Sequence, residues 1–145
     1  MAHLFLTKGG LKELAELDHV DIMAFLVGAA CHDLGHDGFT NNYHSNAVTD
    51  RAIRYNDLSI QENYHVAESF NLMQRTDMSF LESLTPDEFK VYRKRMIGCI
   101  LATDMAKHAS DLSALKSLVE AKQIRSGTNA SLALNKESDA SLFKS

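Results

Sequence analysis

The 145-residue chain has few of the residues that interrupt helices or cross-link small folds. It has one proline and seven glycines, and it shows no strand-like alternation of polar and apolar residues. Its two cysteines, Cys31 and Cys99, exclude a disulfide scaffold and a cysteine-rich zinc site, and they fit a reducing compartment. The sequence therefore predicts an all-α, cytoplasmic protein.

Long apolar runs and excess positive charge are also missing. The longest apolar run covers residues 22–31, about ten residues, and is too short to span a bilayer. The N-terminus lacks the charged segment of a signal peptide. The formal net charge of −4 argues against a nucleic-acid partner held through phosphate contacts. With 45% apolar residues, the chain is expected to fold as one domain or part of one.

Helix-start signals and apolar spacings predict five or six helices and no sheet. Asp18 is a good N-cap, and two capping boxes follow, Ser59 with Glu62 and Thr85 with Glu88. Short helices are expected over residues 11–17 and 47–54, and further helices after Asp18 and Ser59 and over residues 112–122. A long helix is expected after Thr85 and reaches His108. An irregular loop with one turn is expected at residues 34–46, and a polar surface loop at residues 123–145.

The helix after Asp18 is expected to bury the face formed by Ile22, Phe25, Leu26 and Ala29. His32 and Asp33 continue this face, and a buried His–Asp pair is costly unless it is paired or binds a metal. Imidazole and carboxylate are ligands for zinc, iron, manganese and magnesium, and His36 follows three residues later. A metal site and a core histidine beside a helix-terminal aspartate both remain open here.

Two further acidic residues have a structural and a functional interpretation. Glu62 caps its helix, and the same first turn can also face a site. Asp104 interrupts the apolar stripe of its helix and either belongs to a site or pairs with His108, four residues on. His65 is expected to be a partner for its helix rather than a ligand. The other histidines, His3, His19 and His44, are expected to be exposed or to make routine core contacts.

Three ordered blocks resemble the catalytic domain of the class I 3′,5′-cyclic nucleotide phosphodiesterases, members of the HD-domain superfamily of metal-dependent phosphohydrolases. The blocks are residues 29–41 (AACHDLGHDGFTN), 55–65 (YNDLSIQENYH) and 100–108 (ILATDMAKH). Their order and spacing resemble the family pattern over nearly the whole chain. The resemblance implies the multi-helix phosphodiesterase fold, with residues 1–145 as its central portion.

The resemblance also implies an activity and a set of roles. The family hydrolyses cAMP, cGMP or both to nucleoside 5′-monophosphates with two divalent metal ions, zinc and magnesium or manganese. By resemblance, His32 and Asp33 are metal ligands, with Asp33 bridging both ions. His36 and Glu62 are the catalytic residues that hold the water. The resemblance places Thr103 and Asp104 among the residues that support this water and its metal, and Asn41 and Met105 at the substrate pocket.

Several family features are expected outside these residues. The resemblance implies a Tyr-His-Asn-x-x-His motif before Met1, which supplies the general acid and a metal ligand, and a ligand aspartate after Ser145. Residue Asp37 stands where the family has proline, which is interpreted as a loop change. The isolated chain is therefore expected to be inactive by itself. It is expected to belong to a larger, active enzyme that carries regulatory domains and is able to form a homodimer. The alternatives are a catalytically dead fragment that acts as an interaction module, and, with less support, another HD phosphohydrolase.

Overall fold

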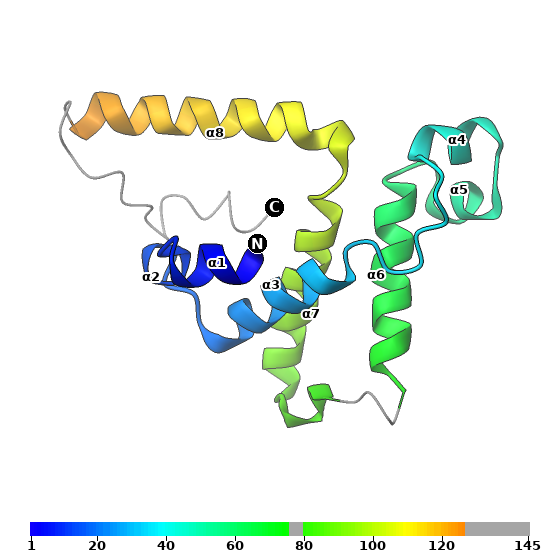
Figure 1. Cartoon of the computed structure of the whole chain (residues 1–145), viewed down its shortest axis with the longest axis horizontal. Helices are drawn as coiled ribbons and strands as arrows, with labels where there is room; N and C mark the ends of the chain where they lie inside the picture. Colours follow the sequence, from blue (N-terminus) through cyan, green and yellow to red (C-terminus); the bar gives the residue numbers. More distant parts are fainter. Residues whose placement is uncertain (76–79, 127–145) are drawn as a thin grey trace.

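The structure, a computed structural model, describes residues 1–75 and 80–126, and this part of the chain is helical with no strand (Figure 1). The predicted all-α class is confirmed. The helices are α1 (Ala2–Thr7), α2 (Leu11–Leu14), α3 (His19–Cys31), α4 (Asn41–Asn46), α5 (Asp50–Tyr55), α6 (Ile60–Met73), the 3₁₀ helix η1 (Phe80–Ser83), α7 (Pro86–Leu101) and α8 (Met105–Ser126).

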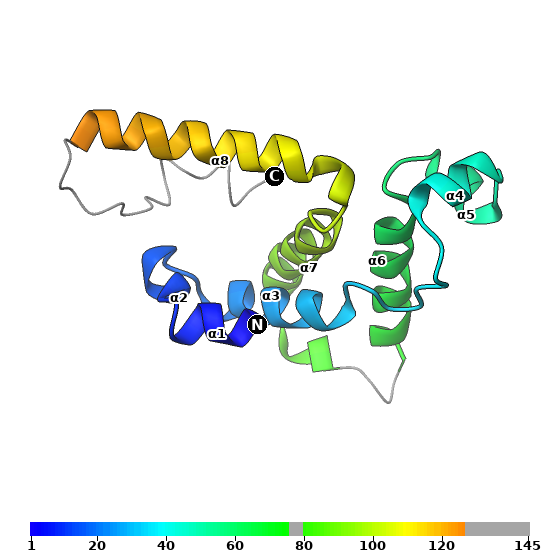
Figure 2. The ribbon, with the colours of Figure 1, turned by 45° about the horizontal axis from the view of Figure 1, so that its top comes forward.

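The core forms where α3 crosses α7 and where α6 runs beside α7 (Figure 2). Its buried members are Val20, Ala24, Phe70, Met73, Tyr92, Met96 and Ile100. Phe70 and Met73 lie on α6, and Tyr92, Met96 and Ile100 lie on α7, at the three- and four-residue spacings of one helical face. Burying each large side chain contributes about 1.5–3 kcal/mol, so this three-helix junction is a main source of stability for the described chain.

All three predicted helix starts are confirmed, because α3, α6 and α7 begin directly after Asp18, Ser59 and Thr85. The Asp18 carboxylate accepts from the backbone N–H of Asp21 at 2.8 Å, and Thr85 and Glu88 form a reciprocal capping box. The capping box expected at Ser59 is wrong, because Ser59 has a positive φ of 43° and its side chain makes no capping bond. Glu62 is thereby released from the capping role.

The buried face of α3 also differs from the prediction. Its buried residues are Val20, Asp21, Ala24 and Gly28, whereas Leu26 and Ala29 are exposed. Residues 22–31 are apolar almost all round the helix, so the pattern has no polar side that fixes the rotation of the helix. Contact with α7 decides it instead, since a Cβ at Gly28 would lie 3.3 Å from the Cβ of Cys99.

Several elements depart from the expectations, among them the helices expected over residues 11–17, 47–54 and 112–122, which are observed as α2 (Leu11–Leu14), α5 (Asp50–Tyr55) and part of α8 (Met105–Ser126). The loop expected at residues 34–46 contains α4, which Thr40 caps by accepting from the N–H of Tyr43. The helix expected to reach His108 ends at Leu101, and α8 begins at Met105. The N-terminal α1 was not predicted. Helix α8 extends away from the α3–α7 core in both ribbon views (Figures 1 and 2).

The polar loop expected at residues 123–145 is only partly described. Residues 123–126 belong to α8, and the rest lies outside the described residues. Among the described residues, no helix combines the length and the apolar character that crossing a membrane requires.

Candidate active site

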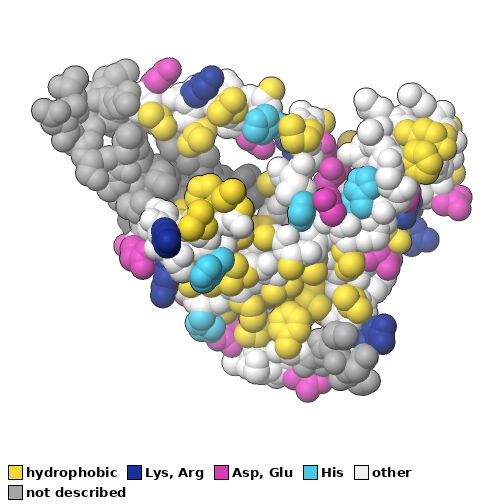
Figure 3. Space-filling view, viewed as in Figure 1, with side chains coloured by type: hydrophobic (Ala, Val, Ile, Leu, Met, Phe, Trp, Pro, Cys, Tyr) yellow, Lys and Arg dark blue, Asp and Glu magenta, His cyan; other side chains and the backbone are white. Residues whose placement is uncertain are grey.

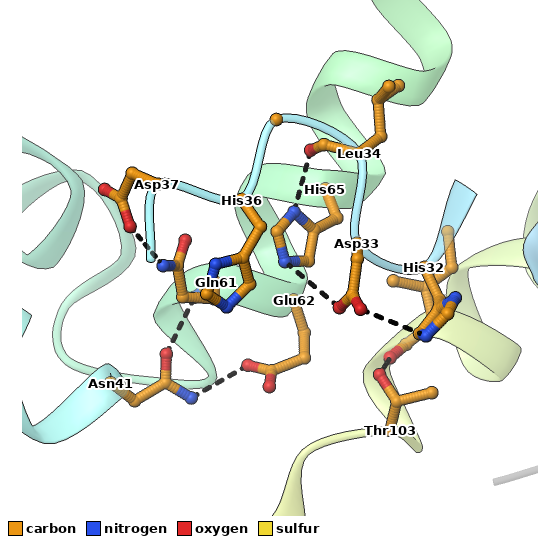
Figure 4. A network of polar contacts seen from close by, with 12 residues as sticks. His32, Asp33, Leu34, His36, Asp37, Asn41, Gln61, Glu62, His65 and Thr103 are labelled. Atoms are coloured by element: carbon orange, nitrogen blue, oxygen red, sulfur yellow. Dashed lines mark hydrogen bonds and ion pairs between the residues drawn. The ribbon is translucent and has the colours of Figure 1, made fainter. Parts of the chain in front are cut away.

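The candidate site lies where the loop after α3 passes the N-terminal half of α6 and the turn between α7 and α8 (Figure 4). The loop leaves α3 through a tight turn, in which the His36 N–H donates to the Asp33 carbonyl at 3.1 Å. Gly35 has a positive φ of 73°, and a Cβ there would lie 3.0 Å from the Tyr64 ring. A glycine is required at this position for both reasons. Figure 3 shows histidine and acidic side chains gathered on the face above α6 and α7.

The Asp33 carboxylate faces two histidines. Its Oδ2 lies 3.2 Å from Nε2 of His32, and its Oδ1 lies 4.0 Å from Nε2 of His65. In each ring Nδ1 faces a backbone carbonyl, that of Ala29 at 3.0 Å and that of Leu34 at 2.8 Å. A carbonyl only accepts, so Nδ1 carries the hydrogen, and in the neutral rings both Nε2 lone pairs point toward the carboxylate.

This donor set fits a cation. Two nitrogen lone pairs and an anionic carboxylate attract each other only through a proton or a positive ion between them. Metal-ligating histidines are commonly oriented by a carbonyl on their other nitrogen, as His32 and His65 are. Within residues 1–75 and 80–126, no three His, Cys, Asp or Glu side chains are arranged to hold an ion. The described part thus offers a His–Asp pair rather than the complete set of a closed site.

His32 and Asp33 are not buried, which corrects the expectation that they continue a buried helix face. Their side chains are 46% and 64% exposed. Helix α3 ends at Cys31, and the turn that follows directs both side chains away from the core. The sequence favoured a metal here because burying a His–Asp pair is costly, and that reason does not hold for exposed side chains. The reason that the structure offers is that the His32 and His65 rings both direct Nε2 toward the Asp33 carboxylate.

His36 has a defined orientation although it is exposed. The Gly38 N–H donates to its Nδ1 at 2.9 Å, so the neutral ring carries its hydrogen on Nε2. The ring stacks on His65 with the centroids 5.6 Å apart. His36 therefore offers an N–H donor, whereas His32 and His65 offer lone pairs.

Glu62 is held by a side chain from α4. Asn41 donates from Nδ2 to Glu62 Oε2 at 2.9 Å, and its Oδ1 accepts from the Gln61 backbone N–H at 2.8 Å. Asn41 thus occupies the first turn of α6 in place of the expected Ser59 cap. The second Glu62 oxygen remains available to accept a hydrogen bond (Figure 4).

The third block contributes residues from the turn after α7. Thr103 donates to the Ile100 carbonyl at 2.7 Å and lies near His32 in Figure 4. Asp104 is 7% exposed, accepts from the Ser59 hydroxyl at 2.7 Å and caps the first turn of α8 through the Ala106 N–H. Asp104 therefore pairs with Ser59 and the Ala106 N–H rather than with His108, the partner considered from the sequence. Met105 is 74% exposed.

The structure thus brings His32, Asp33, His36, Asn41, Glu62 and Thr103 toward one region. Sequence reasoning undervalued His65, which is 1% exposed and faces Asp33, although its spacing of three from Glu62 on one helix was a usable signal. It also undervalued Asp37, Arg51 and Gln61. These residues lie on three separate elements, and their spacing along the chain does not predict that they contact one another.

Comparisons with known proteins show which family this chain is similar to. A family model described as 3′5′-cyclic nucleotide phosphodiesterase matches residues 1–143. The high affinity cGMP-specific 3′,5′-cyclic phosphodiesterase 9A of Mus musculus is 41% identical over 111 residues, which are 77% of this chain and 20% of that protein. The dual specificity calcium/calmodulin-dependent 3′,5′-cyclic nucleotide phosphodiesterase 1B of Bos taurus is 36% identical over 118 residues, 81% of this chain and 22% of that protein.

A solved structure has the same arrangement of helices. The phosphodiesterase domain of the RhoPDE fusion protein from the choanoflagellate Salpingoeca rosetta superposes with a TM-score of 0.73 at 38% identity, over 88% of this chain and 38% of that chain.

The all-helical fold matches that of a phosphodiesterase catalytic domain. The chain belongs to the 3′,5′-cyclic nucleotide phosphodiesterase family. It spans about a fifth of the length of the curated relatives it matches. Membership in this family implies dependence on divalent metal ions.

Proposed function

We propose that the chain forms part of an active site that hydrolyses 3′,5′-cyclic nucleotides to nucleoside 5′-monophosphates. The observation that carries the proposal is the Asp33 carboxylate, which faces Nε2 of His32 at 3.2 Å and Nε2 of His65 at 4.0 Å. In the reaction a water oxygen bonds to phosphorus, the bond from phosphorus to the 3′ oxygen breaks, and that oxygen takes a proton.

His32 and Asp33 are the proposed metal ligands, with Zn²⁺ and Mg²⁺ or Mn²⁺ as the two ions. When bound, such ions lower the pKa of a water and offset the charge of a phosphate. The Ala29 carbonyl holds the His32 ring so that Nε2 faces the Asp33 carboxylate, which is 64% exposed. The Nε2 of His65 faces the other Asp33 oxygen at 4.0 Å.

His36 and Glu62 are the proposed catalytic residues. The His36 Nε2–H is a donor suited to a water or a phosphate oxygen, because Nδ1 already accepts from Gly38. The Glu62 carboxylate is suited to accept from a water, and Asn41 orients it through Oε2. A donor and an acceptor on opposite sides of one water fix its orientation, which is a large part of what positioning contributes to catalysis.

The remaining proposed residues support or border this region. Thr103 lies near His32, and Asp104 secures the turn that carries Thr103 through its bond with Ser59. Asn41 and the exposed Met105 border the proposed nucleotide pocket. The names of the relatives include a cGMP-specific and a dual specificity enzyme, so the proposed substrate class covers both bases. We further propose a cytoplasmic setting with regulatory domains elsewhere in the same polypeptide.

The test uses the native polypeptide that contains these residues, captured with an antibody to residues 59–73. Hydrolysis of cAMP and cGMP is measured for the wild type, Asp33→Ala and Asp50→Ala, which alters an exposed aspartate in the first turn of α5. Asp33→Ala should lower kcat by about 1,000-fold or more, because metal ions contribute several kcal/mol. Asp50→Ala should retain wild-type turnover.

Metal removal is the second arm of the same test. Dialysis against a chelator should abolish turnover, and adding back Zn²⁺, Mg²⁺ or Mn²⁺ singly and in pairs should identify the ions that restore it. Turnover that survives Asp33→Ala, or that is indifferent to the chelator, would contradict the proposed function.

A further inference from the structure

Three polar side chains from separate elements form a closed cluster beside the candidate site. Gln61 of α6 donates from Nε2 to Oδ1 of Asp37 in the loop at 2.6 Å. Arg51 of α5 donates from Nη1 to Oε1 of Gln61 at 2.7 Å, and the same nitrogen lies 3.1 Å from Oδ2 of Asp37. Each of the three side chains thus contacts both of the others. We call Asp37, Arg51 and Gln61 the polar triangle.

The polar triangle holds the loop on both sides of His36. On one side, Arg51 Nη2 donates to the Gly35 carbonyl at 3.4 Å. On the other, Gln61 Nε2 donates to the Phe39 carbonyl at 2.8 Å, and Asp37 accepts from the Phe39 N–H at 3.2 Å. The loop between these points includes His36 and the Gly38 N–H that fixes its ring.

The same triangle is anchored firmly in the helices. Gln61 is 3% exposed, and its backbone N–H donates to the Asn41 side chain that holds Glu62. The Arg51 guanidinium lies 3.5 Å from the centroid of the Tyr64 ring, a cation–π contact on the next turn of α6. His44, 3% exposed, places Nε2 3.3 Å from Asp37.

The loop depends on these contacts because apolar burial does not fix it. Residues 35–40 are all exposed, so the position of His36 is not set by packing in the core. Charge-assisted hydrogen bonds in a fully partnered network are stronger and more directional than isolated ones. One end of the network is Gln61, the chain neighbour of Glu62, and the other end is the loop that carries His36. The network therefore sets the distance from His36 to Glu62.

We propose that Asp37, Arg51 and Gln61 act as one positioning unit that fixes His36 relative to Glu62. The proposal rests on the proposed function, in which His36 and Glu62 orient one water. From the sequence, Asp37 is interpreted only as a loop change, and the proposal gives it a positioning role. Arg51 and Gln61 share this role, and neither side chain takes part in the reaction itself.

The kinetic test compares Arg51→Met with Arg54→Met in the native polypeptide. Arg54 lies on the same helix and is exposed, so the second variant is a matched control for removing a charge from α5. Arg51→Met should lower kcat by about 10- to 100-fold, because misplacement of catalytic groups by about 1 Å costs this much. KM should change far less, Arg51→Lys should restore part of kcat, and Arg54→Met should match the wild type.

A double variant tests whether Asp37 and Arg51 act together as one unit or contribute independently to kcat. Asp37→Asn and Arg51→Met should each lower kcat, and their combination should lower it by less than the product of the two effects, because both break the same network. Multiplicative effects would overturn the claim of a single unit.

A spectroscopic test does not depend on turnover. Nitrogen NMR of the 145-residue chain should show the His36 ring as the Nε2–H form, and Arg51→Met should mix the two ring forms while the amide signals of α7 stay unchanged. Unchanged His36 signals in a folded Arg51→Met chain, or equal changes in Arg54→Met, would overturn the positioning unit. Lack of hydrolysis by the wild-type polypeptide would instead overturn the proposed function, and the His36 signals would still decide the positioning claim.

Discussion

Ser59 donates from its hydroxyl to Oδ2 of Asp104 at 2.7 Å, across 45 positions of the chain. Ser59 precedes α6 with a positive φ of 43°, and Asp104 is 7% exposed and accepts from the Ala106 N–H at the start of α8. The contact joins the beginning of α6 to the turn between α7 and α8. It therefore holds Glu62 and Thr103, which arise from distant parts of the sequence, in one region.

Removing this contact should destabilise the protein. Ser59→Ala leaves a buried carboxylate oxygen without its donor, and hydrogen bonds to charged groups contribute about 1.5–3 kcal/mol. We expect the free energy of unfolding in urea to fall by about 2 kcal/mol. Ser45→Ala is the matched control, because the Ser45 hydroxyl donates to Asp57 at 2.6 Å in an exposed position. The control should lose less than about 0.5 kcal/mol.

Equal losses in the two serine variants would contradict this account. They would mean that burial of Asp104 adds nothing to the contact, and the junction of α6 with the α7–α8 turn would need another explanation.

The second prediction concerns the stability of variants at Tyr92 in the core. This side chain is fully buried, and its hydroxyl donates only to weak acceptors, the sulfur atoms of Met73 at 3.4 Å and Met96 at 3.3 Å. Tyr92→Phe keeps the ring and removes a poorly compensated hydroxyl, so stability should stay within about 1 kcal/mol of the wild type. Tyr92→Ala should lose about 3–5 kcal/mol through the cavity. Urea unfolding of both variants tests the difference.

Titration provides an independent check on Tyr92. Burial raises its pKa to about 12, with a smaller contribution from Cys31. The phenolate absorbance assigned by comparison with Tyr92→Phe should therefore appear only near the upper end of the accessible pH range. Ionisation of Tyr92 at the ordinary value of 10.0 would show that the side chain is in contact with water.

Local signals predicted the helical fold well where they were unambiguous. Thr85, Glu88 and the proline between them define the start of α7, and Tyr92, Met96 and Ile100 give its buried stripe. The face of α3 could not be predicted, because an almost wholly apolar helix has no polar side and its partner α7 sets the rotation. The break at Asp104 was missed since the apolar stripe continues up to it.

The site was predictable to the extent that its residues lie in contiguous motifs. His32, Asp33 and His36 fall within five positions, and Glu62 and His65 within one helical turn. The positive φ of Ser59, which releases Glu62 from capping, has no clear signal in the sequence. Nor does the meeting of Asp37, Arg51 and Gln61, which depends on how three elements pack.

Divalent metal binding by the 145-residue chain can be followed without catalysis. Mn²⁺ should broaden the NMR signals of His32 and its neighbours first, because His32 and Asp33 present a nitrogen lone pair and a carboxylate 3.2 Å apart. Binding should be weak, since two protein ligands are fewer than metal sites normally use. Asp33→Ala should remove the selective broadening, and Asp50→Ala should leave it. Broadening centred elsewhere in the described chain would contradict the assignment of His32 and Asp33.

The Asp37 carboxylate should make stability depend on pH in the acidic range. Partial burial raises its pKa, but hydrogen bonds from Gln61 and the Phe39 N–H, together with Arg51 and His44, outweigh this and lower the pKa from 3.8 to about 2. Between these values the unfolded chain binds more protons than the folded one, so the contribution of Asp37 is present above about pH 4 and is lost as the pH falls toward 2.

Urea unfolding of the wild type and Asp37→Asn isolates this contribution from that of the other carboxylates. The wild type should be the more stable protein at about pH 5, and its advantage should shrink by up to about 1 kcal/mol at about pH 3. That figure is an upper bound because the Asp37 side chain is 29% exposed and solvent screens its interactions. Asp50→Asn is the matched control for removing a carboxylate. An advantage that stays constant or grows on acidification would contradict the hydrogen bonds assigned to Asp37, and with them the hold of Gln61 and Arg51 on the loop.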